Sequence, residues 1–261
     1  MKIKQGKASI DREATGQLRE RAERLASLSP EKRELIRRQM AERRLGGSEL
    51  VARALRECGV THVYAVAGQP TESVLPACQA NTIRPIGVYH QTSAICMALA
   101  HNYQAGRLEA VALVSAGPAV SNAITGLLVA RDNGWPVILL GGNRSSFQHF
   151  DAFPIVNPVA KHAFRVTSTD SLQEHVHQAY RIAISGRPGP VYLDLYEDAL
   201  TGHARPASHG EPGTGRNNAP AIADTDLETI ADTLLSARRP AILLGKGVRW
   251  TVSTDRLRRL I

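Results

Sequence analysis

The sequence has no run that approaches the roughly eighteen uninterrupted apolar residues needed for a membrane helix. Its first residues, MKIKQGKASIDREATG, also lack the apolar block of a secretory signal peptide. We therefore expect no membrane partner and a cytoplasmic location. Cysteine is scarce: Cys58, Cys78 and Cys96 lie far apart without a CxxC pair, which argues against a disulfide framework or a zinc cluster and favours buried free thiols.

Most of the net positive charge of the chain lies in one segment. The chain carries a formal charge of +8, and residues 1–45 hold thirteen Lys or Arg against seven Asp or Glu, so +6 of it lies there. Acidic residues are mixed through this segment and no aromatic residues interleave with the basic ones, a pattern typical of a solvated helical face. We therefore expect no nucleic-acid partner.

Residues 1–45 are predicted to form a charged helical extension. Asp11 is a candidate cap for a first helix, and Ser29-Pro30-Glu31 combines an N-cap residue, a proline in the first turn and an early acidic residue. The extension resembles, by composition, the docking segments of modular synthase subunits. A helix packed on its own domain explains the pattern equally well.

Residues 46–200 alternate helical and strand-like segments. Glu49–Cys58 has the periodicity of an amphipathic helix, and apolar runs predict strands at 61–66, 86–89, 110–115, 137–141 and 191–195. These runs are apolar almost throughout, as expected for parallel strands that are covered on both faces. A doubly wound α/β fold with a parallel sheet follows, with its ligand site in the loops beyond the strand carboxyl ends.

A change of composition follows this domain. Residues 201–220 are rich in Gly, Pro, Ser and Asn and predict a linker. After it, Thr225–Ala237 predicts a helix, and Pro240–Gly247 predicts a strand with a glycine turn. Residues 221–261 are therefore interpreted as the beginning of a second, incomplete α/β domain.

Seven motifs follow one another between Gly46 and Asp198. They are Cys58-Gly59-Val60 leading to Ala67-Gly68, His90-Gln91, Ser115-Ala116-Gly117-Pro118 with Ser121-Asn122, Asn133-Gly134-Trp135-Pro136, Phe147-Gln148, Lys161, and Gly186-Arg187-Pro188-Gly189-Pro190-Val191. In this order and near this spacing they resemble the pyrimidine-binding domain of thiamine-diphosphate-dependent enzymes of the acetolactate synthase, pyruvate oxidase and benzoylformate decarboxylase superfamily.

The resemblance implies a cofactor site and names its residues. Thiamine diphosphate would be contacted by Gly68, Gln91, Gly117, Pro118 and Asn122, and the catalytic candidates are Gln91, His90 and Gln148. In this superfamily a glutamate at the second position of the His90-Gln91 pair assists proton loss from the cofactor. A glutamine can hydrogen-bond the pyrimidine but cannot exchange a proton with it. Each of these residues also has a structural explanation: His90 as a helix-opening residue, Gln148 as loop packing and Lys161 as a solvated cation.

Several positions depart from the superfamily pattern. Ala67 replaces a proline, Ala119 replaces a glycine that lets backbone approach a ligand, and Asn133 stands where aspartate is common. No Gly-Asp-Gly, the motif that holds Mg²⁺ and the diphosphate in the superfamily, occurs anywhere in the sequence, and we assign no metal ligand to this chain.

The resemblance therefore implies one subunit of a split enzyme that decarboxylates a 2-oxo acid and transfers the product. A second subunit with the Gly-Asp-Gly domain would hold Mg²⁺ and the diphosphate, and a homodimer or heterotetramer is the expected assembly. Two alternatives remain: a catalytically degenerate scaffold or regulatory partner, and a fragment of a longer enzyme.

Overall fold

The computed structural model describes residues 29–32, 44–146, 149–207, 222–251 and 254–260. The chain divides into two compact units, residues 1–44 and 45–261. In the first, residues 30–32 are helical, and the Lys32 N–H donates to the Ser29 hydroxyl at 3.4 Å. The predicted helix start at Ser29 is therefore confirmed, whereas Asp11 lies outside the described residues.

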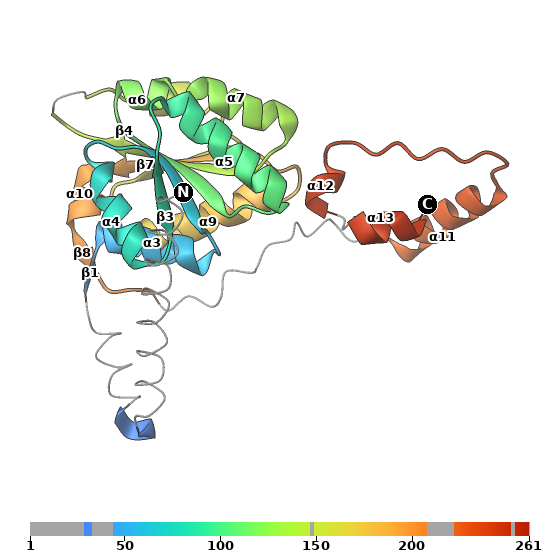
Figure 1. Ribbon diagram of the computed structural model, residues 1–261, viewed down its shortest axis with the longest axis horizontal. Coiled ribbons are helices and arrows are strands. Elements are labelled where there is room, and N and C mark those ends of the chain that lie inside the picture. The colour runs from blue at the N-terminus through green and yellow to red at the C-terminus, as the bar shows by residue number, and fades with distance from the viewer. Residues whose placement is uncertain (1–28, 33–43, 147–148, 208–221, 252–253, 261) are drawn as a thin grey trace, which may run out of the picture. The chain divides into compact units, whose positions relative to one another are not determined.

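The second unit contains a six-stranded sheet in which every neighbouring pair is parallel. The strand order β3-β2-β4-β5-β7-β6 confirms the predicted doubly wound fold (Figure 1). The strands are β2 (His62–Val66), β3 (Arg84–Gly87), β4 (Ala110–Ala116), β5 (Val137–Asn143), β6 (His162–Val166) and β7 (Pro190–Tyr196).

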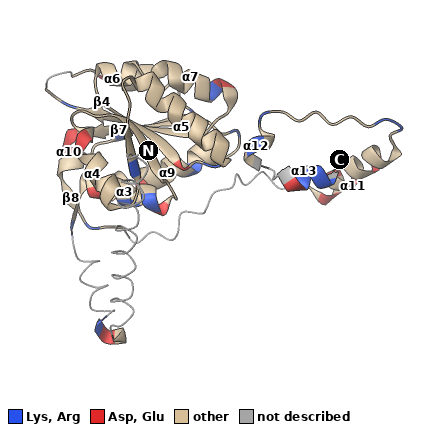
Figure 2. Cartoon of the chain, viewed as in Figure 1, with Lys and Arg blue, Asp and Glu red and all other residues tan. Residues whose placement is uncertain are grey.

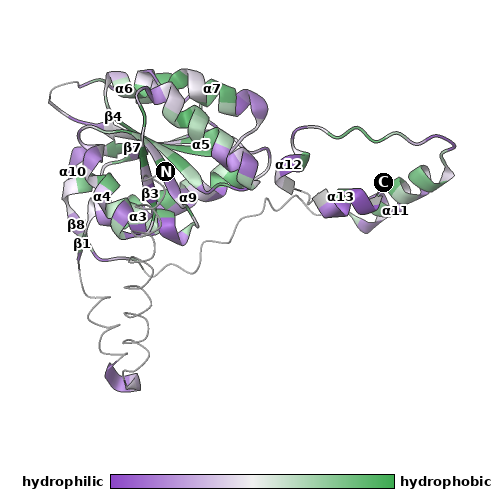
Figure 3. Cartoon of the chain, in the orientation of Figure 1, coloured by the Kyte–Doolittle hydropathy of each residue, from purple (hydrophilic) through white to green (hydrophobic). Residues whose placement is uncertain are grey.

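Helices cover both faces of the sheet (Figure 1). One face packs α3 (Gly47–Glu57), α4 (Val74–Ala80), α9 (Leu172–Ile184) and α10 (Glu197–Thr201), and the other packs α5 (Gln91–Ala105), α6 (Pro118–Ser121), α7 (Ile124–Asn133) and α8 (Phe153–Val156). Short 3₁₀ turns, η1 (Thr71–Ser73) and η2 (Thr169–Ser171), precede α4 and α9. Along β4, Val111 and Leu113 belong to the first core, while Ala112 and Val114 belong to the second. Burial on both sides explains the nearly continuous apolar strands, which Figure 3 shows in green.

Two cations close the ends of helices next to the sheet. The Lys161 ammonium donates to the Ile182 and Ser185 carbonyls at 2.5 and 2.6 Å, at the C-terminus of α9. The Arg187 guanidinium donates to the Arg131 and Asp132 carbonyls at 3.1 and 3.0 Å, at the C-terminus of α7. Both satisfy carbonyls that lack partners within a helix. Lys161 is therefore a structural cap rather than a solvated cation.

Some predicted details were wrong. The strand expected at residues 86–89 lies at Arg84–Gly87, and Tyr89 beyond it is fully exposed. The strand expected within Pro240–Gly247 does not form: residues 241–245 are irregular, and Leu243 is 99% exposed. An apolar run becomes a strand only where a neighbour pairs with its backbone, and the described residues give this run none. Cys96 is exposed, although Cys58 and Cys78 are buried as expected.

The remaining elements flank the sheet domain in sequence. The predicted helix at 225–237 forms as α11 (Asp224–Ser236), followed by α12 (Val248–Thr251) and α13 (Thr254–Leu260). A two-stranded antiparallel pair joins β1 (Leu45–Gly46) to β8 (His203–Ala204), so the first residues of the predicted linker are paired. In the described part of the chain, no helix is long and apolar enough to cross a membrane.

Candidate functional site

The carboxyl ends of β2, β4 and β5 meet at one edge of the sheet, and their loops are tied together. The Ala116 N–H, at the end of β4, donates to the Gln69 carbonyl beyond β2 at 3.1 Å. The Thr71 hydroxyl is hydrogen-bonded to the Gly68 and Val114 carbonyls at 3.1 and 3.0 Å. This hydroxyl is fully buried, so the two loops form one rigid surface.

Glycine is required where these loops approach one another. A Cβ atom at Gly68 would lie 2.7 Å from the Ser115 Cβ, and one at Gly142 would lie 2.5 Å from the Pro70 Cδ. Gly117 adopts φ 65° and ψ −120° and precedes α6, in which Pro118 is the first residue. These positions give the edge a narrow floor of backbone and small side chains.

Three predicted residues lie together where α5 begins and α6 ends. His90 is the N-cap of α5, and its Nδ1 accepts from the Thr92 N–H at 3.2 Å. The Thr92 hydroxyl donates to the Asn122 carbonyl at 2.6 Å, and the Asn122 amide donates to the Gln91 Oε1 at 3.2 Å. Among the described residues, the Gln91 Nε2 has no partner, so this amide group remains a donor.

The structure thus brings Gln91 and Asn122 into contact and gives the His90 imidazole a capping bond through one nitrogen. Gly68 and Gly117 lie on the adjacent loops. Gln148, the third catalytic candidate, lies outside the described residues.

A polar group at this edge was missed by sequence reasoning. Arg144, directly after β5, donates to the Gln69 Oε1 at 2.5 Å and to the Glu197 Oε2 at 3.2 Å. Its side chain is only 19% exposed. The available signal was a cation immediately after a buried strand, at the edge where ligand loops gather.

The strand next to β5, β7, carries a buried carboxyl group. Asp194 on β7 accepts from the Tyr192 hydroxyl at 2.8 Å and from the Asn143 amide at 3.0 Å. Burial raises the pKa of Asp194 above its usual range, although these two hydrogen bonds and Arg165 oppose the shift. Burial and the neighbouring Asp194 also raise the pKa of Tyr192 well above its ordinary value.

We expect Asp194→Asn to gain stability relative to the wild type as the pH rises above about 4. A carboxyl with a raised folded-state pKa contributes most below its unfolded pKa, and its contribution is lost as the pH rises through the folded pKa. The amide has no such loss. Urea unfolding of both proteins between pH 3 and pH 7 measures the difference, and a difference independent of pH would contradict the assignment.

Comparisons with known proteins show the family of this chain. Residues 45–179 match the family model described as thiamine pyrophosphate enzyme, N-terminal TPP binding domain. The chain belongs to the thiamine pyrophosphate enzyme family.

Curated relatives come from several branches of this family. The chain is 34% identical over 207 residues to a catabolic acetolactate synthase of Raoultella terrigena, which covers 76% of this chain and 36% of that protein. It is 30% identical over 230 residues to oxalyl-CoA decarboxylase of Escherichia coli K12, covering 82% and 40%. It is 29% identical over 230 residues to 2-hydroxyacyl-CoA lyase of Arabidopsis thaliana, covering 83% and 40%. The chain thus spans well under half the length of these relatives.

The residues present fit one part of thiamine diphosphate. The Gln91 amide can donate to a ring nitrogen of the pyrimidine. A carboxamide does not titrate, so the group present fits binding of the pyrimidine better than proton exchange with it. In the described part of the chain, no group of three or more His, Cys, Asp or Glu side chains is placed to hold a metal ion.

Proposed function

We propose that this chain supplies the pyrimidine side of a thiamine diphosphate site in a 2-oxo acid decarboxylase or carboligase of the acetolactate synthase type. The observation that carries the proposal is the Gln91 amide, whose Oε1 accepts from Asn122 and whose Nε2 donor has no partner among the residues that the structure describes. Family membership and the relatives named acetolactate synthase support the same conclusion.

Thiamine diphosphate, when bound, would supply an acidic thiazolium carbon that becomes a nucleophile toward 2-oxo acids once its proton is lost. In this proposal Gln91 orients the pyrimidine by donating a hydrogen bond, and Asn122 fixes the rotamer of Gln91. Gly68, Gly117 and Pro118 form the floor against which the cofactor lies. His90 is the proposed proton carrier, and Gln148, which lies outside the described residues, is the proposed polar contact to the substrate.

The second candidate function is a degenerate domain that acts as a scaffold or regulatory partner. The Gln91 side chain favours it, because it cannot carry out the proton exchange that general acid–base catalysis requires. The two functions differ in what Gln91→Glu would do, as described in the Discussion.

We further propose that Mg²⁺ and the diphosphate are held by a second polypeptide with a Gly-Asp-Gly motif. Helix α5 contains no Lys, Arg, Asp or Glu, as Figure 2 shows, and it exposes Met97 and Tyr103 at 42% and 38%. Leu128 and Val129 on α7 are also exposed, at 40% and 39%. An uncharged helix with exposed apolar side chains is typical of a surface that a partner covers. A homodimer or a heterotetramer through this surface remains part of the proposal.

We expect the purified chain to bind thiamine diphosphate more weakly than micromolar, because only the pyrimidine side is present. Thiamine, which lacks the diphosphate, should bind equally weakly for the same reason. Calorimetric titration with both ligands and Mg²⁺ tests this, before and after co-purification with a Gly-Asp-Gly polypeptide from the same genome. Light scattering of the mixture reports assembly.

The outcomes separate the two halves of the proposal. Sub-micromolar binding by the chain alone would refute the need for a second polypeptide. The shared site would be supported by two results together. Before assembly both ligands should bind equally weakly, and after assembly thiamine diphosphate should bind tightly while thiamine should not. A stable monomer that joins no such polypeptide would leave the scaffold function.

A further inference from the structure

Two histidine rings pack together at the amino edge of the sheet, the edge opposite the candidate site. His62 is the first residue of β2, and His101 lies in the last turns of α5. Their ring centroids are 4.4 Å apart, with planes inclined at 53°. Both residues are partly buried. Neither has a part in the function proposed above.

Hydrogen bonds hold both rings in place. His101 Nε2 lies 3.0 Å from the Glu109 carboxylate, to which it donates, and its Nδ1 lies 3.1 Å from the Tyr64 hydroxyl. His62 Nδ1 lies 2.8 Å from the Thr61 hydroxyl, which also lies 3.2 Å from the Glu109 carbonyl.

The charges around His62 oppose its protonation. His101 faces it from α5, and Arg84 is its register partner on β3. Glu109 is the carboxylate that faces the cluster, and it already accepts from His101 and, at 2.6 Å, from Arg107. Burial, His101 and Arg84 together lower the pKa of His62, and Glu109 offsets this only in part.

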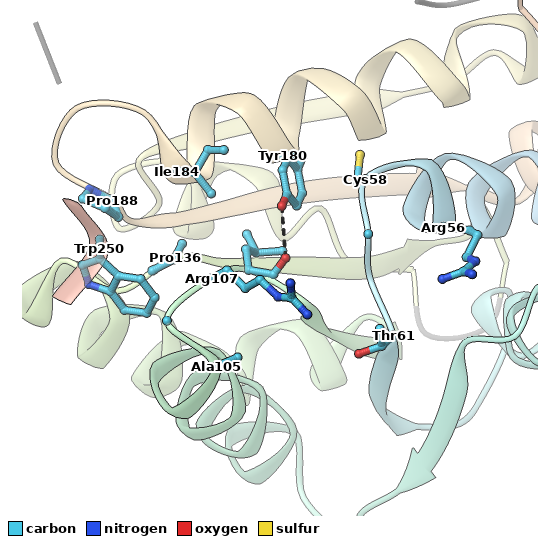
Figure 4. Close-up of a pocket in the computed structure, with 13 residues that line it drawn as sticks. Arg56, Cys58, Thr61, Ala105, Arg107, Pro136, Tyr180, Ile184, Pro188 and Trp250 are labelled. Carbon is cyan, nitrogen blue, oxygen red and sulfur yellow. Dashed lines mark hydrogen bonds between the residues drawn. The ribbon is translucent and has the colours of Figure 1, made fainter. Parts of the chain in front are cut away.

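The geometry points to an acid-sensitive latch, in which the neutral His62 ring packs on His101 and holds the last turns of α5 against the amino ends of β2 and β4, and in which those turns loosen when His62 takes up a proton. Release is local, because the buried Asn102 side chain donates to the Ala110 and Pro136 carbonyls and accepts from the Glu109 and Ala110 N–H groups. A cavity of about 490 Å³ is lined by Tyr64, His101 and Glu109, so solvent reaches the cluster. A second cavity of about 740 Å³ at the same sheet edge is lined in part by Thr61 and Arg107 (Figure 4).

The direction of the effect follows from the lowered pKa of His62. The unfolded chain binds this proton more readily than the folded one, so the latch contributes fully above the unfolded histidine pKa of about 6.5. Its contribution is lost as the pH falls below that value. Since Gln91 is the first residue of the same helix, a fall in pH would also affect the candidate site. This consequence rests on the proposed function, whereas the latch itself does not.

The first test compares urea unfolding of the full chain and of His62→Asn between pH 7.5 and pH 5. The asparagine side chain keeps a partner for Thr61 but takes up no proton. We expect the wild type to lose stability relative to His62→Asn as the pH falls. The matched control is His162→Asn, at the first residue of β6, whose ring also lies 4.4 Å from an aromatic neighbour, Phe164. This control should keep the acid sensitivity of the wild type.

A second test reads the latch directly. NMR titration of the imidazole protons should show the titration midpoint of His62 shifting upward in His101→Asn, because the His101 ring is one of the groups that lower the pKa of His62. Amide hydrogen exchange at the end of α5, corrected for the intrinsic pH dependence, should rise between pH 7.5 and pH 5.5 in the wild type and not in His62→Asn. An unchanged His62 midpoint in His101→Asn, or equal exchange in both proteins, would overturn the latch.

Discussion

Replacing Gln91 with Glu is expected to accelerate proton loss from the thiazolium carbon of bound thiamine diphosphate by about 10²- to 10⁴-fold, the usual contribution of a positioned acid–base group. The glutamate side chain has nearly the same length, and its carboxylate can accept from the Asn122 amide as the Gln91 Oε1 does at 3.2 Å. The substitution therefore adds a titratable group without removing the contact that orients it. The substitution also replaces the Nε2 donor with a carboxyl oxygen, which donates to the pyrimidine only when it is protonated.

The measurement is deuterium exchange at that carbon, followed by NMR after acid quenching, in the chain assembled with its diphosphate-binding partner. Gln69→Glu is the matched control, because it adds the same charge to the neighbouring loop, where Gln69 accepts from Arg144. A rise in Gln91→Glu but not in Gln69→Glu supports the enzymatic function. An unchanged rate in both variants would show that Gln91 does not contact the pyrimidine.

Four strands of the sheet, β2, β4, β5 and β7, could be predicted from the sequence because they lie in nearly continuous apolar runs. The edge strand β6 was not predicted, because it alternates exposed and buried residues and contains His162 and Arg165. Val137–Asn143 and Pro190–Tyr196 are fully or almost fully buried from end to end, and only strands covered on both faces have this composition. The run at residues 241–244 has the same composition without a pairing partner in the described residues. Composition alone could not distinguish these cases, since pairing is a property of the neighbours.

The sequence predicted which residues belong to the candidate site, but not the contacts between them. Motif order predicted that Gln91 and Asn122 both belong to the cofactor site, but not the hydrogen bond between them, which depends on where α5 begins and α6 ends. Arg144 could not be predicted as a bridge, because its partners Gln69 and Glu197 lie 75 and 53 residues away in the sequence. Such contacts are set by the packing of three separate loops, for which the sequence has no periodic signal.

The N-terminus of α3 offers the second large effect, this time on stability. Gly47 is buried against α10, and a Cβ atom there would lie 2.0 Å from the Ala199 carbonyl oxygen and 2.8 Å from the Leu200 Cα. The backbone cannot simply move away, because the Gly47 N–H donates to the Gly202 carbonyl at 3.0 Å. In an exposed helix, Gly to Ala would stabilise the protein by about 1 kcal/mol. Here the clash with backbone atoms outweighs that gain.

We expect Gly47→Ala to lower the free energy of unfolding by about 3 kcal/mol, the upper part of the range for overpacked sites, because both clashing groups are backbone atoms rather than flexible side chains. Gly87→Ala is the matched control: a Cβ atom at Gly87 meets no atom within 4 Å, so its effect should stay within about 0.5 kcal/mol. Urea unfolding followed by circular dichroism measures both. If the urea midpoint of Gly47→Ala equalled that of the wild type, the start of α3 would not pack against α10 as closely as described.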